Sequence, residues 1–393
     1  FIIAFSYYII FIYGGATMNY RNFNADGTPI SLLGYGFMRM PTDQDGKIDY
    51  QKAKELVDTA YKNGVNYFDT AYMYHGGESE LFLAKALADY PRESYHIANK
   101  MPLWMAKTSD DVDRIFEEQL KKCNTEYFDF YLVHAVNKDI FKKLKELGAY
   151  EKLIARKESG QIKRLGFSFH DSTEVLREVL DSYKWDFVQL QLNYFDWSYQ
   201  DAKGQYEAVT SRGLQVIVME PVRGGSLVSL TPDADRMLLT ARPERTVPSW
   251  AMRFAAHLDG VLCVLSGMSN EDALMDNLAS LSDSELFTDG DKAVALKAAE
   301  MLLAAKTVPC TACGYCYVCP RSIAIPKLFK MYNEYSVDGD KDWFMKRYDK
   351  LIPEEKPFNC IKCGVCSKRC PQQIDIPARL AEIDRITKEL RNR

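Results

Sequence analysis

Eight of the ten cysteines in this 393-residue chain lie in two short runs near its C-terminal end. The runs are Cys310, Cys313, Cys316 and Cys319, and Cys360, Cys363, Cys366 and Cys370, each followed by a proline. Three closely spaced thiolates followed by Cys-Pro are typical of proteins with 4Fe–4S clusters, in which the last cysteine of each run ligates the cluster of the other run. The spacing therefore predicts two clusters. One is bound by the first three cysteines of the first run with Cys370, and the other by the first three of the second run with Cys319.

Zinc is the alternative occupant of these thiols. Two four-cysteine zinc sites need only Cys-x2-Cys pairs, so the third cysteine and the proline of each run would be surplus. The pattern therefore favours clusters. Only two residues precede the Cys-Pro of the first run, which makes Cys319 the least regular ligand. Cys123 and Cys263 lie far from both runs, and we expect them to be buried core thiols.

A second group of reactive residues follows strand-like segments in the first 135 residues. Asp69, Lys100 and His134 each end such a segment, and Tyr74 lies in the loop after Asp69. A neighbouring ammonium stabilises a phenolate, so we expect Lys100 to lower the pKa of Tyr74 while Asp69 holds Lys100 in place. We expect His134 to contact the substrate oxygen. This group suits carbonyl reduction, in which the phenol protonates the oxygen as hydride reaches the carbon.

Each of these residues also has an ordinary structural interpretation. Asp69 could cap a helix, Lys100 could be a solvated strand end, and His134 and Tyr74 could pack in the core. Tyr72 could also compete with Tyr74 for the role of proton donor. The four residues together at strand ends favour the catalytic interpretation.

The elements that would position these residues alternate regularly between Met18 and Ala305. The strand-like runs are Leu32–Phe37, Val65–Asp69, Tyr95–Lys100, Phe128–His134, Lys163–Ser168, Phe187–Leu192, Gln215–Met219 and Gly260–Leu265. Helical periodicity lies between them, at Asp49–Asn63, Glu78–Ala88, Asp110–Cys123, Thr173–Ser182 and Val247–His257. Eight alternations predict an α/β fold, a (β/α)8 TIM barrel with its active site at the C-terminal ends of the strands. The absence of a Gly-x-Gly-x-x-Gly motif after the first strand counts against a Rossmann fold.

These segments resemble the aldo/keto reductase superfamily over residues 19–279. The resemblance is carried by residues 64–74, Ile97–Lys100, Tyr131–His134, Gly166–Ser168 and the stretch from Ser266 to Asn277. It implies a (β/α)8 barrel that binds a nicotinamide nucleotide, usually NADPH, without a Rossmann domain. It also implies a catalytic tetrad of Asp69, Tyr74, Lys100 and His134.

The same resemblance implies a set of nucleotide contacts. Ser168 and Gln189 match residues that contact the nicotinamide amide, and Asp276 and Asn277 match an acid-amide pair that faces the adenine. The loop of Arg223, Gly224 and Gly225 can supply backbone N–H groups and a guanidinium to the pyrophosphate, and Gly267 and Met268 complete the expected nucleotide contacts. Phe169 and Met219 depart from the family pattern. Gly267 and Ala273 stand where basic residues usually hold a 2′-phosphate, so NADP and NAD both remain open.

The C-terminal part is expected to be a separate domain. Helix-like stretches at Ile325–Glu334, Asp342–Leu351 and Pro377–Arg391 surround the second cysteine run, and the segment resembles the α-helical ferredoxin domains of some dehydrogenases. The fused arrangement resembles the iron–sulfur aldo/keto reductases. We therefore predict a barrel over residues 18–300 and a mainly α-helical ferredoxin-like domain with two 4Fe–4S clusters over residues 301–393.

Composition limits the partners. An apolar content of 47% excludes a disordered or fibrous protein. Residues 306–393 carry 17 Lys and Arg against 11 Asp and Glu, an excess that compensates for negatively charged clusters, and no nucleic-acid motif accompanies it. Residues 1–17 contain an apolar run shorter than the roughly 20 residues of a membrane span. We expect them to be an upstream extension, with a membrane-targeting segment as the alternative, and we expect a cytoplasmic protein without membrane or nucleic-acid partners.

Three functions remain open. The first is reduction of an aldehyde, ketone or quinone-like substrate with NAD(P)H and Tyr74 as general acid, with clusters that are structural or redox-sensing. A nicotinamide delivers two electrons as hydride whereas a cluster moves one at a time. The second function is therefore a reductase that receives single electrons through the clusters from a ferredoxin-like or flavin partner, such as a small electron-carrier protein. The third is a non-catalytic electron-transfer or docking protein.

Overall fold

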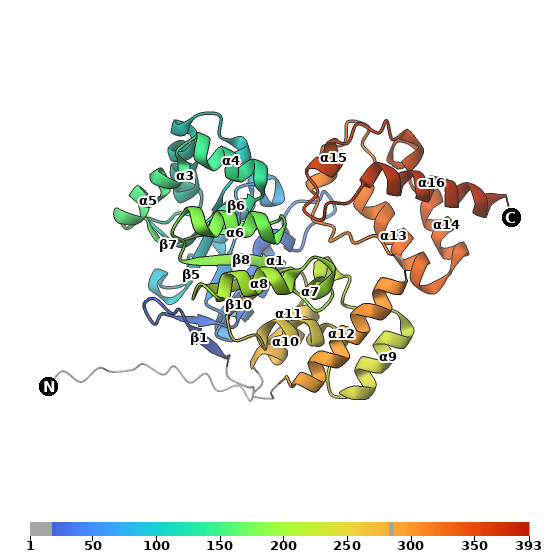
Figure 1. The fold of residues 1–393 in the computed structure, drawn as a ribbon, viewed down its shortest axis with the longest axis horizontal. Coiled ribbons are helices and arrows are strands. Elements are labelled where there is room, and N and C mark those ends of the chain that lie inside the picture. Colours follow the sequence, from blue (N-terminus) through green and yellow to red (C-terminus); the bar gives the residue numbers. More distant parts are fainter. Residues whose placement is uncertain (1–17, 283–286, 306, 393) are drawn as a thin grey trace.

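The computed structural model describes residues 18–282, 287–305 and 307–392. The prediction that residues 1–17 are an upstream extension concerns residues outside these ranges. Two parts are visible in Figure 1, a barrel surrounded by helices and a smaller helical unit at its side. Within the described ranges, no helix combines the length and apolar character needed to span a membrane.

Eight parallel strands form a closed barrel in the order β10-β3-β4-β5-β6-β7-β8-β9. The strands are β3 (Leu33–Gly36), β4 (Tyr67–Asp69), β5 (His96–Met101), β6 (Phe128–Val136), β7 (Ile162–Phe169), β8 (Phe187–Gln191), β9 (Gln215–Met219) and β10 (Val261–Ser266). An antiparallel hairpin of β1 (Tyr20–Asn22) and β2 (Pro29–Ser31) precedes them. The predicted (β/α)8 fold is confirmed, although the hairpin was not anticipated.

Helices surround this barrel. They are α1 (Tyr50–Lys62), α2 (Ser79–Ala86), α3 (Ser109–Lys122), α4 (Lys138–Glu146), α5 (Ala149–Glu158), α6 (Thr173–Ser182), α7 (Asp196–Tyr199), α8 (Ala202–Thr210), α9 (Pro232–Ala241), α10 (Val247–Ala256), α11 (Glu271–Ser282) and α12 (Asp289–Ala304). Helix α3 shows why they form, because Thr108 and Asp111 make a capping box and Val112, Ile115 and Phe116 share one buried face.

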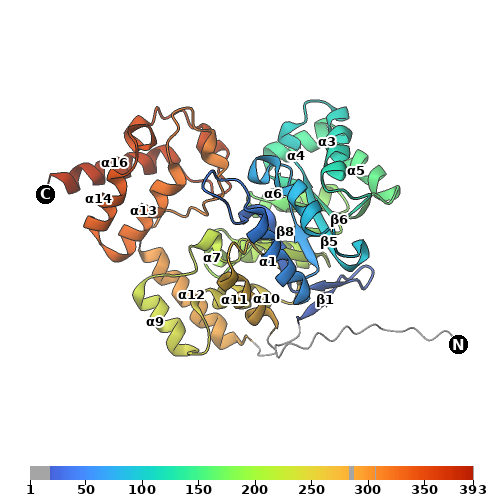
Figure 2. The ribbon, with the colours of Figure 1, turned by 180° about the vertical axis from the view of Figure 1, so that it is seen from behind.

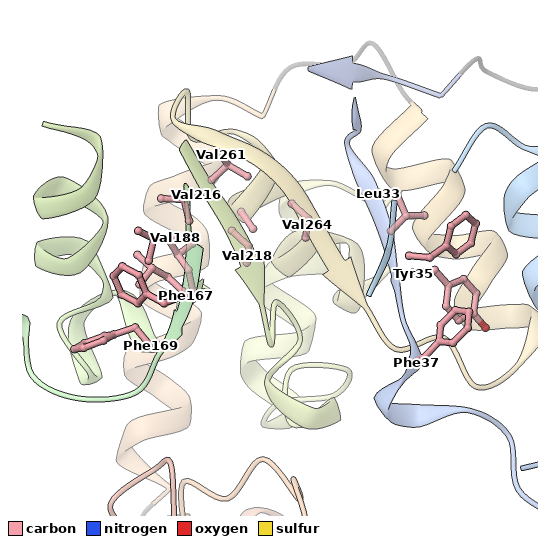
Figure 3. Close-up of a cluster of buried hydrophobic side chains, with 14 of the residues drawn as sticks. Leu33, Tyr35, Phe37, Phe167, Phe169, Val188, Val216, Val218, Val261 and Val264 are labelled. Atoms are coloured by element: carbon pink, nitrogen blue, oxygen red, sulfur yellow. The ribbon is translucent and has the colours of Figure 1, made fainter. Parts of the chain in front are cut away.

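Apolar side chains of the strands alternate between two sides of the barrel wall. Leu33, Tyr35, Val216 and Val218 point outward and pack in the layer between strands and helices, as Figure 3 shows. Side chains of the opposite set, among them Phe130, fill the interior. This alternation follows from the two-residue period of a strand.

The C-terminal part is a helical unit with its own core. It contains α13 (Ile325–Asp338), α14 (Lys341–Asp349), α15 (Val365–Lys368) and α16 (Ile376–Arg391), together with the 3-10 turn η6 (Tyr315–Val318). Leu328, Phe329 and Phe344 are fully buried in a cluster distinct from the barrel core. The predicted helical C-terminal region is confirmed. The proposed division at residue 300 falls within α12, which packs on α9 and α10 of the barrel, and the exact domain limits stay a prediction.

Candidate active site

The four residues predicted to be catalytic lie together at the C-terminal end of the barrel strands. Asp69 ends β4, Lys100 lies near the end of β5, and His134 lies in β6. Tyr74 begins the 3-10 turn η2 (Tyr74–Gly77) that follows β4. Because neighbouring parallel strands end at the same edge, their terminal side chains converge.

A buried ion pair is the centre of this group. The ammonium Nζ of Lys100 donates to Oδ1 of Asp69 at 2.5 Å and to the carbonyl oxygen of Thr70 at 2.7 Å. The same Nζ lies 4.9 Å from the ring centroid of Tyr74. The rings of Tyr74 and His134 are 6.0 Å apart and nearly perpendicular. Lys100 is thus paired with the acid and lies near the ring of the phenol.

Tyr72 is excluded as a competitor for this position. Its hydroxyl donates to Glu118 at 2.8 Å, and the ammonium of Lys122 lies 3.8 Å from its ring centroid. Tyr72 therefore contacts helix α3 on the outside of the barrel, away from the Asp69 and Lys100 pair.

The electrostatics of the site correct the expected pKa of Tyr74. Burial raises the pKa of Tyr74 well above its ordinary value, and the charge of Asp69 adds to this effect. The expected net lowering of this pKa by Lys100 is wrong, because the effect of burial outweighs the attraction of nearby cations. Burial also lowers the pKa of His134 well below its ordinary value, helped by the charge of Lys100. At neutral pH the site therefore presents a protonated phenol and a neutral imidazole.

A cavity of about 770 Å³ opens beside Asp69 and Tyr74, within the size range of small-molecule sites. Six of the predicted nucleotide contacts line it, namely Gln189, Gly224, Gly225, Gly267, Asp276 and Asn277. The carbonyl oxygen Oε1 of Gln189 is buried and has no hydrogen-bond partner within the described ranges. An unsatisfied buried amide at the wall fits the recognition of a nicotinamide carboxamide.

The other three predicted contacts do not line the cavity. The Oγ of Ser168 accepts a hydrogen bond from the backbone N–H of Ala135. Met268 is fully buried, and its carbonyl oxygen accepts from the hydroxyl of Tyr35. Arg223 is also buried. Ser168, Met268 and Arg223 therefore lie behind the residues that line the cavity.

Arg223 departs most from its expected role. Its Nε donates to Asp196 at 2.9 Å and its Nη2 donates to Oε1 of Gln372 at 3.2 Å. The guanidinium therefore joins the barrel to the helical unit and does not face a pyrophosphate. Next to it, a side chain at Gly224 would collide with the carbonyl oxygen of Thr311, so this glycine is required by close backbone approach.

Arg39 is a cavity residue that the sequence interpretation missed. Its Nη2 donates to the carbonyl oxygen of Thr311 at 2.7 Å and to Glu220 at 3.2 Å. Its side chain also covers Gly267. Its place just after the first strand-like run was the available signal, since residues following barrel strands form the active-site mouth.

The helical unit supplies one wall of the cavity. Thr311, Cys313, Tyr315, Pro371 and Gln372 line it together with Tyr74. The Tyr315 hydroxyl lies 3.3 Å from Nε2 of His134. The amide of Gln372 exchanges hydrogen bonds with Gln191 at 2.8 and 3.1 Å. The C-terminal unit is therefore part of the candidate active site, a role that the sequence interpretation did not assign to it.

The cysteines border two small hollows of the helical unit. Cys310, Cys313, Cys316 and Cys370 line one, and Cys319, Cys360, Cys363 and Cys366 line the other. These are the two sets that the spacing predicts. In the described part of the chain, no three His, Cys, Asp or Glu side chains converge as the ligands of a single metal ion. Four thiols around each hollow are the number that a 4Fe–4S cluster needs, although their role as ligands stays a prediction.

Comparisons with known proteins agree with both parts of the chain. Residues 32–293 match the model of the aldo/keto reductase family, and residues 309–374 match that of the 4Fe–4S dicluster domain. Among curated proteins, the NADH-specific methylglyoxal reductase of Escherichia coli strain K12 is 22% identical over 302 residues, covering 66% of this chain and 90% of that protein. A probable aldo-keto reductase 1 of Glycine max is 29% identical over 151 residues, covering 36% of this chain and only 42% of that protein.

Solved structures show the same barrel. The holo form of aldo-keto reductase AKR11C1 from Bacillus halodurans superimposes with a TM-score of 0.60 at 23% identity, covering 72% of this chain and 96% of that one. An aldo-keto reductase from Klebsiella pneumoniae in complex with NADPH gives a TM-score of 0.58 at 18% identity, covering 72% and 94%. At these identities the likeness concerns the fold.

Proposed function

This chain belongs to the aldo/keto reductase family, and from that membership we propose that it reduces the carbonyl group of a small molecule with a nicotinamide nucleotide. Tyr74 is the proton donor in this proposal. The observation that carries it is geometric: the Tyr74 ring lies 4.9 Å from the ammonium of Lys100, which is paired with Asp69, at the wall of a cavity of about 770 Å³. The Tyr74→Phe experiment that opens the Discussion tests it.

The residues of the site have distinct tasks in this reaction. A bound nicotinamide supplies hydride to the carbonyl carbon. Tyr74 holds the proton until negative charge develops on the carbonyl oxygen, because burial keeps its pKa high. The ammonium of Lys100 stabilises the phenolate left behind, and Asp69 fixes that ammonium in place. The neutral His134 orients the oxygen by hydrogen bonding.

The nucleotide is expected to be NADH. The loop and helix after β10 bring Asp272, Ala273 and Asp276 to the cavity, and Arg39 is the one arginine or lysine among the described lining residues. Because Arg39 is paired with Glu220, a 2′-phosphate would meet carboxylates and no free cation.

We therefore expect NADH to bind about 10-fold more tightly than NADPH, a difference of about 1.4 kcal/mol. Fluorescence titration of the holoprotein measures both dissociation constants. The Ala273→Arg variant should narrow the gap by supplying a cation for the phosphate. Equal affinities in the unmodified protein would contradict the assignment.

Tyr315 is expected to position the substrate from the helical unit. Tyr315→Phe removes the hydroxyl beside His134, so we expect kcat/KM for a small aldehyde to fall about 10-fold, the effect of losing one hydrogen bond to a developing charge. Steady-state kinetics with iron quantitation measures this. Tyr317→Phe is the matched control, because Tyr317 belongs to the same turn but is 72% exposed. An equal fall in kcat/KM in both variants would contradict this role and indicate a general disturbance of the turn.

A second candidate is a reductase that receives electrons one at a time through its helical unit. The specific observation in its favour is that Cys313 lines the same cavity as Tyr74. A bound cluster there supplies single electrons. The test is anaerobic incubation of dithionite-reduced holoprotein with a quinone and no nucleotide. One reduced quinone should form for every two electrons lost by the protein. Product only with NADH would reject this candidate, and no product under either condition would support a non-catalytic protein.

A further inference from the structure

The two cysteine sets lie in opposite surroundings. The set that includes Cys313 and Cys370 faces the barrel, since Cys313 and the residues after Cys370 line the active-site cavity. The other set lies at a surface, where Cys363 is exposed. One cysteine set of the helical unit therefore lies beside the active site, while the other set lies at the open end of the unit, where solvent reaches Cys363.

Exposed apolar side chains gather around that open end. We define the distal face by the residues Val318, Ile352, Phe358, Ile361 and Val365, which are 38–58% exposed. Turn η6, which contains Val318, packs against α15, which contains Val365. Ile361 lines the hollow of the second cysteine set itself. Contiguous exposed apolar side chains of this kind mark interaction surfaces.

Basic residues accompany this face. Arg321, Lys362 and Arg369 are exposed, and Arg321 lines the same hollow as Ile361. Residues 306–393 carry an excess of six positive charges, whereas the rest of the chain carries an excess of ten negative charges. An apolar centre beside basic side chains complements a partner with an apolar centre and an acidic rim.

We propose that the distal face docks a small acidic protein that carries one electron, an inference that rests on the second candidate function. The thiol set at the centre of the face distinguishes such a carrier from other acidic partners. Each reduced carrier gives one electron to the helical unit and leaves oxidised. Two encounters and two protons convert one carbonyl into one alcohol, or one quinone into one hydroquinone, so electrons and protons balance.

Binding, rather than turnover, is the primary test. The probe is a small acidic two-cluster ferredoxin in its oxidised form, titrated into holoprotein by isothermal calorimetry at low and high salt. We expect binding that weakens as salt rises, and at least a 10-fold larger dissociation constant for the Arg321→Glu/Lys362→Glu variant. The matched control is Lys341→Glu/Lys346→Glu, an equal charge change at exposed positions of α14, which lies away from α15 in Figure 1. This control should change the constant less than twofold.

Iron content and melting temperature must be the same in both variants and the unmodified protein. Failure of the unmodified protein to bind the ferredoxin, equal binding by Arg321→Glu/Lys362→Glu, or a preference of the distal face for a short RNA would overturn the proposal. Reoxidation of dithionite-reduced holoprotein by a quinone needs no docking, so it reports on the second candidate function alone. If the protein binds the ferredoxin but does not reduce the quinone, the second candidate function is rejected, while the assignment of the distal face as a docking surface stands.

Discussion

We expect Tyr74→Phe to lower kcat for NADH-dependent reduction of a small aldehyde by about 1,000-fold, the typical contribution of a positioned general acid. The loss is this large because phenylalanine keeps the buried ring beside Lys100 but has no proton to give. The dissociation constant of NADH should stay unchanged, since the hydroxyl acts on the substrate oxygen. Stopped-flow measurement of NADH oxidation in single turnovers isolates the chemical step.

Tyr72→Phe is the matched control for this variant. Tyr72 lies two residues earlier, but its hydroxyl binds Glu118 on α3, so we expect kcat to stay within twofold. Iron content should be the same in both variants. If Tyr74→Phe kept more than a tenth of the activity, another group would be the proton donor and the proposed reaction would lose its basis.

The second large effect is expected at Cys370. Its replacement by alanine removes one thiol from the hollow next to the barrel, and with it the binding of one cluster. We expect iron and sulfide to fall by half. Because binding free energy of a metal group is also folding free energy, a loss of several kcal/mol should lower the melting temperature of the helical unit by at least about 10 °C.

Cys123→Ala provides the comparison. Cys123 is also buried, but it packs in the barrel core near Asn99 and far from both hollows in the sequence. Its replacement should cost about 1 kcal/mol or less and leave iron unchanged. Elemental analysis and differential scanning calorimetry distinguish the two variants. Full iron content in Cys370→Ala, or zinc in place of iron in the unmodified protein, would contradict the predicted ligand sets.

Sequence patterns predicted what depends on local spacing. The strand-like runs locate all eight barrel strands, and Asp49 and Asn63, the ends of one predicted helix, are the caps of α1. Asp69, Tyr74, Lys100 and His134 converge because strand ends in a barrel share one edge. The two cysteine sets that border separate hollows follow from their spacing alone.

Contacts between the two parts of the chain could not be predicted in this way. Arg223 looked like a free cation in a glycine-rich loop, but Gln372, which is 149 residues away, accepts its hydrogen bond. Tyr315 meets His134 across 181 residues for the same reason. The high pKa of Tyr74 also depends on how deeply the assembled site is buried. Nothing in local periodicity encodes these features.

The close fit of Gly224 under the Thr311 carbonyl limits how this protein can be recombined or engineered. A barrel taken from another reductase, with any larger residue at that position, would hold the grafted cysteine-rich unit off the mouth and let solvent reach the Arg223 and Asp196 pair. A chimera that exchanges the barrel or the helical unit must therefore retain a glycine loop that fits under the Thr311 carbonyl. Without such a loop, the barrel and the helical unit must be exchanged together. The fit at their interface, more than the packing of either core, decides which chimeric proteins can assemble this active site.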